Sequence, residues 1–457
     1  MTVLAIEIND SGIRTARDGN WQQVGPGLAL LDPDRPLIGE EARAQARLRP
    51  RRLQNRFWQD LNLQPLSRVM PYAGNNADLA CAQLKAIWDE QGSAAVEAVI
   101  FLVPGFFTSE ALGLLLGVAE DCDMPVRGVI DTAVAATPEL NPGRSLMHLD
   151  IHLHSTVLTE LIAANGVARG EVQVLDAVGL SVLEQSWMGT TAEAFIRQTR
   201  FDPLHDAGTE QILADHLESW LDLLAGQAEA TIELQRGGQN LSASLSRRQL
   251  VEVAAPHYER LARLIDAARL SRGPITLNAS SRMSRLPGLL DRLAEIEDVE
   301  VVALADGQAI LHALERSRDI VSPPDNVRFV TMLPFRDHSQ VADTGSLPPP
   351  PMEDSGPRPT HLLAGSVVYR LSDQPVTVGA APPADQRPVV VSGVMEGVSR
   401  RHCSIFCRGN EVVLEDHSRY GTFLNDHKVQ GEAMLKVGDV VRVGSPGSSL
   451  LLVEARD

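Results

Sequence analysis

Aromatic residues and cysteines are scarce in this chain of 457 residues, and each shortage excludes a class of protein. Aromatic residues make up only 4% of the sequence, too few for the stacking platforms on which single-strand nucleic-acid binders rely. The sequence contains no C-x-x-C pair, so neither a disulfide framework nor a zinc knuckle is expected. The cysteines are Cys81, Cys122, Cys403 and Cys407. This usage fits a reducing compartment, and we expect a cytoplasmic protein.

The sequence also lacks long apolar runs and has fewer basic than acidic residues. No run of about 18 apolar residues occurs, and the start, MTVLAIEIND, lacks a basic region followed by an apolar stretch. We therefore expect neither a membrane span nor an export signal. With 41 Lys and Arg against 59 Asp and Glu, the net charge of −18 disfavours nucleic acid and anionic membranes as partners. The length predicts about three domains or lobes.

A proline-rich segment divides the chain. Residues 337–360 read DHSQVADTGSLPPPPMEDSGPRPT, with hardly any large apolar residue to bury. The successive prolines at residues 348–351 favour polyproline II, so the segment is expected to be a semi-rigid spacer. We place this linker at residues 336–361, between a first part at residues 1–335 and a last part at residues 362–457.

The two parts differ in their hydrophobic patterns. Before the linker, apolar strands such as VLAIEIN and AVIFLVP alternate with helical stretches such as TSEALGLLLGVAEDC, which predicts an α/β fold. After the linker, closely spaced β runs, among them PVTVG, HCSIFC, EVVLED and DVVRVG, predict an all-β sandwich.

Residues 97–137 form the most specific segment of the first part. A buried strand ends at Pro104 and is followed by an amphipathic helix, a second strand and a helix of small residues. Val103, Pro104 and Phe107, together with residues 132–136, resemble motifs of the actin-like ATPase superfamily, in particular of the DnaK-type seventy-kilodalton heat-shock chaperones. Further matches in the family's order extend the resemblance over roughly residues 1–320. The resemblance implies an actin-like ATPase fold of two lobes.

ATP binding in that family depends on glycines, because two β-hairpins bring backbone N–H groups against the phosphates. These glycines are missing here. The family's Asp-x-Gly-Thr-Thr hairpin appears as Glu7, Ile8, Asn9, Asp10 and Ser11, and its Asp-x-Gly-Gly-Gly-Thr hairpin as Asp150, Ile151, His152, Leu153, His154 and Ser155. The adenosine loop begins with Asn278 and Ala279 but keeps Ser281 and Arg282, and a family lysine that contacts the nucleoside corresponds to Glu229.

The first part is therefore predicted to be a pseudo-ATPase that needs no cofactor. The alternative is an active, nucleotide-dependent chaperone-like ATPase that binds ATP and Mg²⁺ in reshaped hairpins, with Asp150 presenting its carboxylate toward the metal.

A histidine-rich strand permits a third reading. Because strand side chains alternate, His148, Asp150, His152 and His154 are expected on one face, where they are plausible ligands for zinc in a metal hydrolase. Otherwise they line an open cleft between the lobes, solvated or hydrogen-bonded, since strand neighbours two apart stand ~6.5 Å from each other and diverge with twist. No H-E-x-x-H or G-x-S-x-G pattern occurs.

The last part contains a Ser-Arg-x-His motif at Ser399, Arg400, Arg401 and His402. A Leu-x-x-Gly-Asp-x-x-x-x-Gly run follows at Leu435, Gly438, Asp439 and Gly444. Both resemble the forkhead-associated (FHA) domain, a β-sandwich whose loops recognise phosphothreonine peptides. The resemblance implies that Ser399 and Arg400 contact the phosphate, for which a hydroxyl and a guanidinium fork are suited, and that His402 braces the loop.

Two residues of the FHA pattern are absent. The family's Gly-Arg appears as Gly379-Ala380, and its Ser-x-Asn-Gly-Thr loop as Ser418, Arg419, Tyr420, Gly421 and Thr422. Tyr420 replaces an asparagine that holds the peptide backbone, whereas Arg419 is a candidate substitute for the lost charge. The domain either retains phosphothreonine recognition or binds an unmodified partner, with Ser399 and Arg400 stabilising the loops.

The sequence therefore predicts a cytoplasmic adaptor or regulatory scaffold of bacterial type. Its pseudo-ATPase part would serve as a docking body, and its FHA domain would recognise protein partners, phosphothreonine-containing ones where phosphate dependence is kept.

Overall fold

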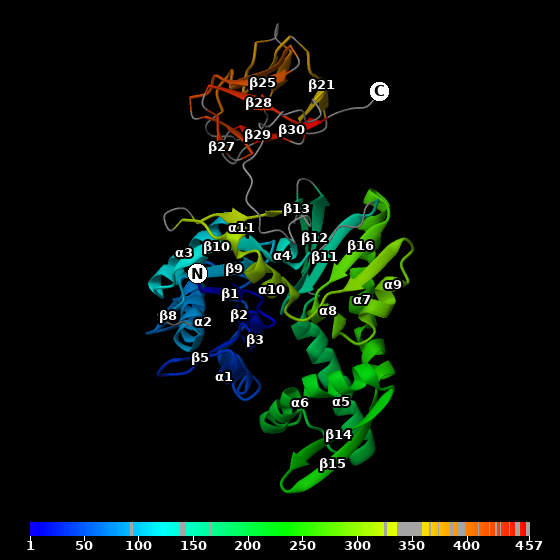
Figure 1. Ribbon diagram of the computed structural model, residues 1–457. Coiled ribbons are helices and arrows are strands. Elements are labelled where there is room, and N and C mark those ends of the chain that lie inside the picture. Colours follow the sequence, from blue (N-terminus) through cyan, green and yellow to red (C-terminus); the bar gives the residue numbers. More distant parts are fainter. Residues whose placement is uncertain are drawn as a thin grey trace, which may run out of the picture. The chain divides into compact units, whose positions relative to one another are not determined.

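A computed structural model divides the chain into two compact units, Met1–Arg336 and Asp337–Asp457 (Figure 1). It describes all residues except 92–94, 138–142, 164–165, 177, 324–326, 336–358, 365–366, 373, 384–386, 391–397, 410, 420, 426, 430, 438, 444–447 and 454–457. Most of the predicted linker at residues 336–361 therefore lies outside the described residues. The same holds for Tyr420, Gly438 and Gly444 of the predicted motifs.

The first unit contains two six-stranded sheets. In the first sheet the order is β3-β2-β1-β9-β10-β18, where β1, β2 and β3 are antiparallel neighbours and β1, β9 and β10 run parallel. Every residue of β9, AVIFLV, is buried, because alternate side chains join apolar clusters on the two faces of the sheet. The strands are β1 (Val3–Glu7), β2 (Ile13–Arg17), β3 (Asn20–Gly25), β9 (Ala98–Val103), β10 (Val126–Asp131) and β18 (Phe329–Val330).

The second sheet repeats this path. Its order β13-β12-β11-β16-β17 corresponds to β3-β2-β1-β9-β10, with the same antiparallel and parallel neighbours, and β19 is added beside β13. The turn after β11 is therefore the counterpart of the turn after β1. The strands are β11 (Ser145–Ile151), β12 (Ser155–Ala163), β13 (Gly166–Asp176), β16 (Ile275–Ala279), β17 (Val299–Ala303) and β19 (Met332–Pro334).

Helices complete the apolar clusters of the first unit (Figure 1). α2 (Asn76–Gln91) and α3 (Ser109–Asp121) pack on the first sheet, and α5 (Leu180–Thr199) and α7 (Arg247–Arg272) on the second. A capping box of Ser246 and Gln249 begins α7. α4 (Thr132–Ala136) and α10 (Gln308–Glu315) bury small residues in a cluster to which both sheets contribute.

Further elements accompany these sheets and helices. α6 (Ala207–Gly226) and the hairpin of β14 (Glu229–Arg236) and β15 (Gln239–Ser246) share the cluster of α5. The others are β4 (Ala29–Leu31), β5 (Pro36–Ile38), α1 (Glu40–Arg43), η1 (Pro50–Arg52), β6 (Leu53–Gln54), β7 (Pro65–Met70), β8 (Ala73–Asn75), α8 (Ser281–Ser284), α9 (Leu289–Ala294) and α11 (Ser317–Ile320).

The second unit is a β-sandwich. Its sheets have the orders β21-β20-β30-β29-β26-β27 and β23-β22-β24-β25-β28, and one apolar cluster contains residues of both. The strands are β20 (His361–Ala364), β21 (Val367–Arg370), β22 (Val376–Gly379), β23 (Pro388–Val390), β24 (Cys403–Arg408), β25 (Glu411–Asp416), β26 (Thr422–Leu424), β27 (His427–Lys428), β28 (Glu432–Leu435), β29 (Val440–Val443) and β30 (Ser448–Val453).

The mixed α/β part and the β-rich part that follows it are thus confirmed. No helix in the described part of the chain is both long and apolar enough to cross a membrane.

Candidate functional site

The turns after β1 and β11, where the resemblance implies phosphate-binding hairpins, contact each other directly. Asn9 Nδ2 donates hydrogen bonds to Asp150 Oδ2 at 2.9 Å and to the Ile151 carbonyl at 3.1 Å. Asp10 Oδ1 accepts from the Leu153 N–H at 2.9 Å. Asn9, Asp10 and Asp150 are all buried. Protein atoms therefore occupy the space between the two turns.

Arg282, in α8, joins both turns through a buried ion-pair cluster. Its Nη1 lies 2.8 Å from Glu7 Oε1 and 3.7 Å from Asp150 Oδ2, and its Nη2 donates to the Gly12 carbonyl at 2.8 Å. Burial by itself lowers the pKa of Arg282, but the carboxylates of Glu7 and Asp150 outweigh burial and hold that pKa above its usual value. Arg282 is thus charged and fully engaged within the protein.

The Asp150 carboxylate is engaged by several groups of the protein. Besides Asn9, the Ser280 hydroxyl donates to its Oδ1 at 2.5 Å. Burial raises the pKa of Asp150, but the positive charge of Arg282 and this hydrogen bond outweigh burial and lower the pKa overall. The carboxylate is therefore ionised and balanced by Arg282.

A second arginine, Arg14 of β2, extends the cluster. Arg14 Nη2 donates to Asp306 Oδ1 at 2.8 Å and to the Ser281 hydroxyl at 3.3 Å, and Nη1 lies 3.8 Å from Glu7 Oε2. Sequence reasoning missed both Arg14 and Asp306, which belong to no motif. The only signal in the sequence was an acidic residue at position 7 together with the retained Arg282.

A small cavity beside this cluster is lined by Glu7, Arg14, His148, Asp150 and Arg282, among other residues. Its volume of about 20 Å³ has room for about one water molecule. Glu7 Oε2 and Arg14 Nε are buried there without a hydrogen-bond partner among the described residues. A bridging water fits these atoms, whereas the phosphates of a nucleotide do not.

The histidines of the β11 region do not converge. His148 lines the small cavity, His152 Nδ1 lies 3.2 Å from Asp10 Oδ1, and His154 Nε2 lies 3.0 Å from the Asn55 carbonyl. Within the described residues, no group of three or more His, Cys, Asp or Glu side chains could hold a metal ion. Of the expected alternatives, hydrogen bonding holds for His152 and His154, whereas solvation does not hold for His148, Asp150 and His152, which are buried.

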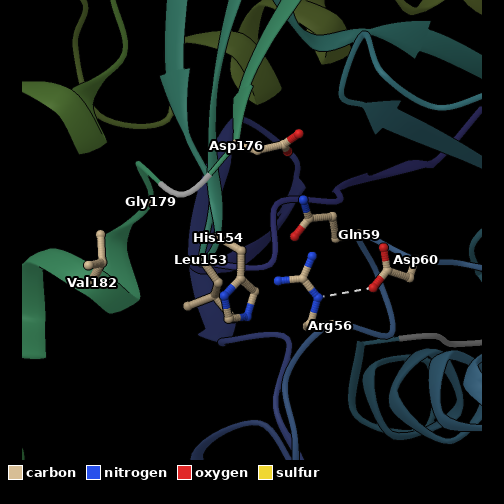
Figure 2. Close-up of a pocket in the computed structure, with 8 residues that line it drawn as sticks. All are labelled: Arg56, Gln59, Asp60, Leu153, His154, Asp176, Gly179 and Val182. Carbon is tan, nitrogen blue, oxygen red and sulfur yellow. Dashed lines mark hydrogen bonds and ion pairs between the residues drawn. The ribbon is translucent and has the colours of Figure 1, made fainter. Parts of the chain in front are cut away.

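His154 faces a separate cavity of about 600 Å³ (Figure 2). Arg56, Asp60 and Asp176 contribute charged groups, and Figure 2 shows Arg56 paired with Asp60, Nε to Oδ2 at 3.0 Å. Burial, followed by the positive charge of Arg56, lowers the pKa of His154. The neutral imidazole is held by backbone and has no nucleophile bonded to it.

Two other predicted nucleotide positions lie away from the turns. Asn278 is not in a loop: it is buried within β16, in register with His148 of β11. Glu229 begins β14, is exposed and bonds to Ser244 of the same hairpin, and its correspondence to a nucleoside-binding lysine stays a prediction. The structure therefore brings together Glu7, Asn9, Asp10, Asp150, His152, Ser281 and Arg282, and leaves out Asn278, His154 and Glu229.

A further cleft of about 400 Å³ is lined by Ser11 and Leu153 of the two turns, by the α1 region and by helices α5 and α6. Gln211 of α6 closes one side: its Oε1 accepts from the Arg47 N–H at 2.9 Å, and its Nε2 donates to the Arg43 carbonyl at 3.0 Å. Ion pairs join Arg47 to Glu210 at 3.3 Å and Arg43 to Glu218 at 3.5 Å. Sequence reasoning missed these residues, because pairs so far apart in the chain leave no local pattern.

Glu184 lines this cleft, and we expect it to make stability depend on pH. Burial raises the pKa of Glu184 to about 7 against the opposing charges of Arg47 and Arg43, and Glu218 adds to the increase. A carboxyl whose pKa is raised in the folded state loses stabilisation as the pH rises from the unfolded value, near 4.5, through 7. Glu184→Gln should therefore raise the free energy of unfolding by about 1 to 2 kcal/mol at pH 8 and change it little at pH 5.

Urea denaturation followed by tryptophan fluorescence measures this effect. The matched control is Asp222→Asn, at an exposed carboxylate of the same cleft, which should change the free energy of unfolding by less than about 0.5 kcal/mol at either pH. An equal effect of Glu184→Gln at pH 5 and pH 8 would contradict the argument.

In the second unit, His402 joins the two loops that contain the predicted phosphopeptide residues. The ring is buried, and its Nδ1 accepts a hydrogen bond from the Ser399 N–H at 3.1 Å. Since Nδ1 accepts, Nε2 carries the proton and donates to the Gly421 carbonyl at 3.3 Å. Burial lowers the pKa of His402, which keeps the ring neutral.

Ser399 and Arg400 are placed to meet an anion. The Ser399 hydroxyl oxygen accepts a hydrogen bond from the Arg419 N–H at 3.2 Å, so its own proton is available for donation. Arg400 is exposed, and its guanidinium makes no hydrogen bond or ion pair with the other described residues. Asp416 stabilises the second loop, which contains Ser418, Arg419 and Gly421. Its carboxylate accepts hydrogen bonds from the Ser418 N–H at 2.9 Å and from the Thr422 hydroxyl at 2.7 Å.

Residue 380 lies beside the first loop, as the FHA resemblance implies for its phosphate-binding arginine. The Ala380 N–H donates to the Ser399 carbonyl at 3.0 Å, and the Ala381 N–H donates to the Arg400 carbonyl at 3.1 Å. A Cβ on Gly379 would collide with the Arg400 carbonyl, so this close approach requires glycine. The loop is thus assembled, but the methyl group of Ala380 supplies no charge.

Comparison with known proteins identifies this unit. Residues 376–444 match the FHA domain family, and the chain therefore contains an FHA domain. The matched range runs from β22 to the end of β29 and includes Ser399, Arg400, His402 and the loop of Arg419 and Gly421. The match does not reach the first unit, and none of the curated proteins matches the chain.

Proposed function

We propose that the protein is a cytoplasmic adaptor that binds phosphothreonine-containing proteins through its FHA domain and carries an actin-like unit that does not turn over ATP. The observation that carries the proposal is the recognition loop, in which the Ser399 hydroxyl and the Arg400 guanidinium face outward on a framework braced by His402. A hydroxyl and a guanidinium match the acceptor oxygens of a phosphate.

The repeated sheet order supports an actin-like fold for the first unit. A chain that forms β3-β2-β1-β9-β10 and then β13-β12-β11-β16-β17 builds two equivalent halves whose turns face each other, as two phosphate-binding hairpins would. Here Asn9 and Asp10 bond across to the other turn, and Arg282 neutralises Glu7 and Asp150. The unit would therefore serve as a protein-docking body.

Selection of peptides tests the recognition step. The full chain should retain members of a degenerate phosphothreonine peptide library and should bind the selected peptide at least ten-fold more tightly than the same peptide without phosphate. Equal affinity for the two peptides would reject phosphate recognition and favour an unmodified protein partner.

For the first unit we predict that Mg-ATP binds with a dissociation constant weaker than about 1 mM, because side chains stand where the family has glycines and Asn9 and Asp10 bond across to the other turn. Isothermal titration calorimetry with the full chain measures this binding. A dissociation constant near 1 μM, with turnover abolished by Asp150→Ala, would instead establish an active chaperone-like ATPase.

A further inference from the structure

The FHA resemblance implies a phosphate-binding arginine where this chain has Ala380, so the phosphate site lacks one cation. Hydrogen bonds between backbone atoms hold residue 380 against the loop of Ser399 and Arg400, and its methyl group cannot contact a phosphate as an ion. A replacement cation can come from the second loop, where Arg419 is one candidate, or from a neighbouring strand that reaches these loops.

Lys428, the last residue of β27, lies against the second recognition loop. Its Nζ lies 3.1 Å from the position that a Cβ atom would occupy on Gly421, so the lysine side chain covers the space that a side chain at residue 421 would fill. Gly421 has a φ of +106°, which strongly favours glycine. The loop therefore has no side chain at residue 421, and the side chain of Lys428 occupies the space beside this residue.

Two contacts connect this point to the phosphate-binding residues. The His402 ring links the Gly421 carbonyl to the Ser399 N–H, and the Arg419 N–H bonds to the Ser399 hydroxyl. The ammonium of Lys428 is therefore held on the same pair of loops as Ser399 and Arg400.

The charges around Lys428 leave it available to an anion. Lys428 is exposed, and it forms no ion pair with any other described residue. Asp416, the carboxylate of this loop, is engaged by the Ser418 N–H and by the Thr422 hydroxyl and N–H. Arg400 and Lys428 are thus exposed, as are Arg401 and Arg419, whereas the Asp416 carboxylate stabilises the loop.

We propose that Lys428 is the second cation of the phosphate site and replaces the arginine that is Ala380 here. The inference rests on the proposed phosphopeptide function: phosphothreonine is held by Ser399, Arg400 and Lys428. An ammonium on a flexible stem suits this position, because it binds phosphate as a point charge and needs no fixed fork geometry.

The test compares Lys428→Met with Lys436→Met in the full chain. Methionine keeps an unbranched apolar stem against Gly421 and removes only the charge. Lys436 follows β28 at the end of that strand away from Gly431 and the recognition loops, so it is the matched control. With the library-selected phosphothreonine peptide, Lys428→Met should weaken binding about ten-fold, Lys428→Arg should restore most of the affinity, and Lys436→Met should have no effect.

The unphosphorylated peptide distinguishes the possible outcomes. Loss confined to the phosphorylated peptide supports a direct contact between Lys428 and phosphate. Equal loss for both peptides shows that Lys428 only stabilises the loop, and unchanged phosphopeptide affinity shows that another residue supplies the charge; either result overturns the inference. If the unsubstituted chain binds the phosphorylated and unphosphorylated peptides with equal affinity, the proposed function itself is rejected. That result is distinguishable from a failure of the Lys428 inference.

Discussion

Replacing Arg282 with methionine is expected to lower the free energy of unfolding of the first unit by about 3 to 5 kcal/mol. The substitution leaves two buried carboxylates, Glu7 and Asp150, with Arg14 as the remaining cation, at 3.8 Å from Glu7. Buried carboxylates that lose a counter-ion cost far more than an exposed ion pair contributes. Arg282 and Glu7 side chains are only 9% and 2% exposed. Urea denaturation of the full chain measures the change. All 5 tryptophans lie at or before residue 220, so their fluorescence reports on the first unit alone.

The control for this prediction is Arg285→Met, one helical turn further along. Arg285 is 49% exposed and pairs with Glu218 at 3.3 Å, so its loss should cost less than about 1 kcal/mol. Adding Glu7→Gln to Arg282→Met should recover part of the lost stability, since one of the two stranded charges is removed. If Arg282→Met stays within about 1 kcal/mol of the parent, the two turns are not held by this cluster.

Arg400→Ala is expected to weaken the library-selected phosphothreonine peptide by roughly ten-fold to a hundred-fold. Hydrogen bonds to charged groups contribute about 1.5 to 3 kcal/mol, and Ala380 leaves no arginine at its position to share the phosphate charge. Binding of the unphosphorylated peptide should change little. Fluorescence anisotropy with labelled peptides measures both affinities.

Arg401→Ala provides the matched control, because Arg401 is the neighbouring exposed arginine and its Nη2 donates to the Ser404 hydroxyl at 3.3 Å. The Arg401→Ala variant should still bind the phosphorylated peptide more tightly than the unphosphorylated one. Should Arg419→Ala rather than Arg400→Ala abolish that preference, the phosphate contact lies on the second loop and our assignment of Arg400 is wrong.

Much of the fold follows from local patterns. The continuous apolar run at β9 predicts a strand buried on both faces, and the alternating β runs after residue 360 predict a sandwich, because burial on one or both faces dictates which positions are apolar. The Ser-Arg-x-His motif likewise predicts the FHA loop, since the spacing places His402 where it can accept from Ser399.

The prediction that failed also has a local cause. The alternation of His148, Asp150, His152 and His154 predicted one shared face, but the strand ends at Ile151 and the turn sends the last two side chains to different partners.

By itself, the sequence determined the absence of phosphate-binding glycines and the presence of Ser399, Arg400 and His402, because side-chain identity decides which groups exist to do chemistry. Only the tertiary structure decided what those groups do. Glu7 and Arg282, separated by 275 residues, form an ion pair because two equivalent sheets place their turns face to face. Lys428 reaches the recognition loop for a similar reason: strand pairing brings its stem across Gly421, and no pattern along the chain records such a contact.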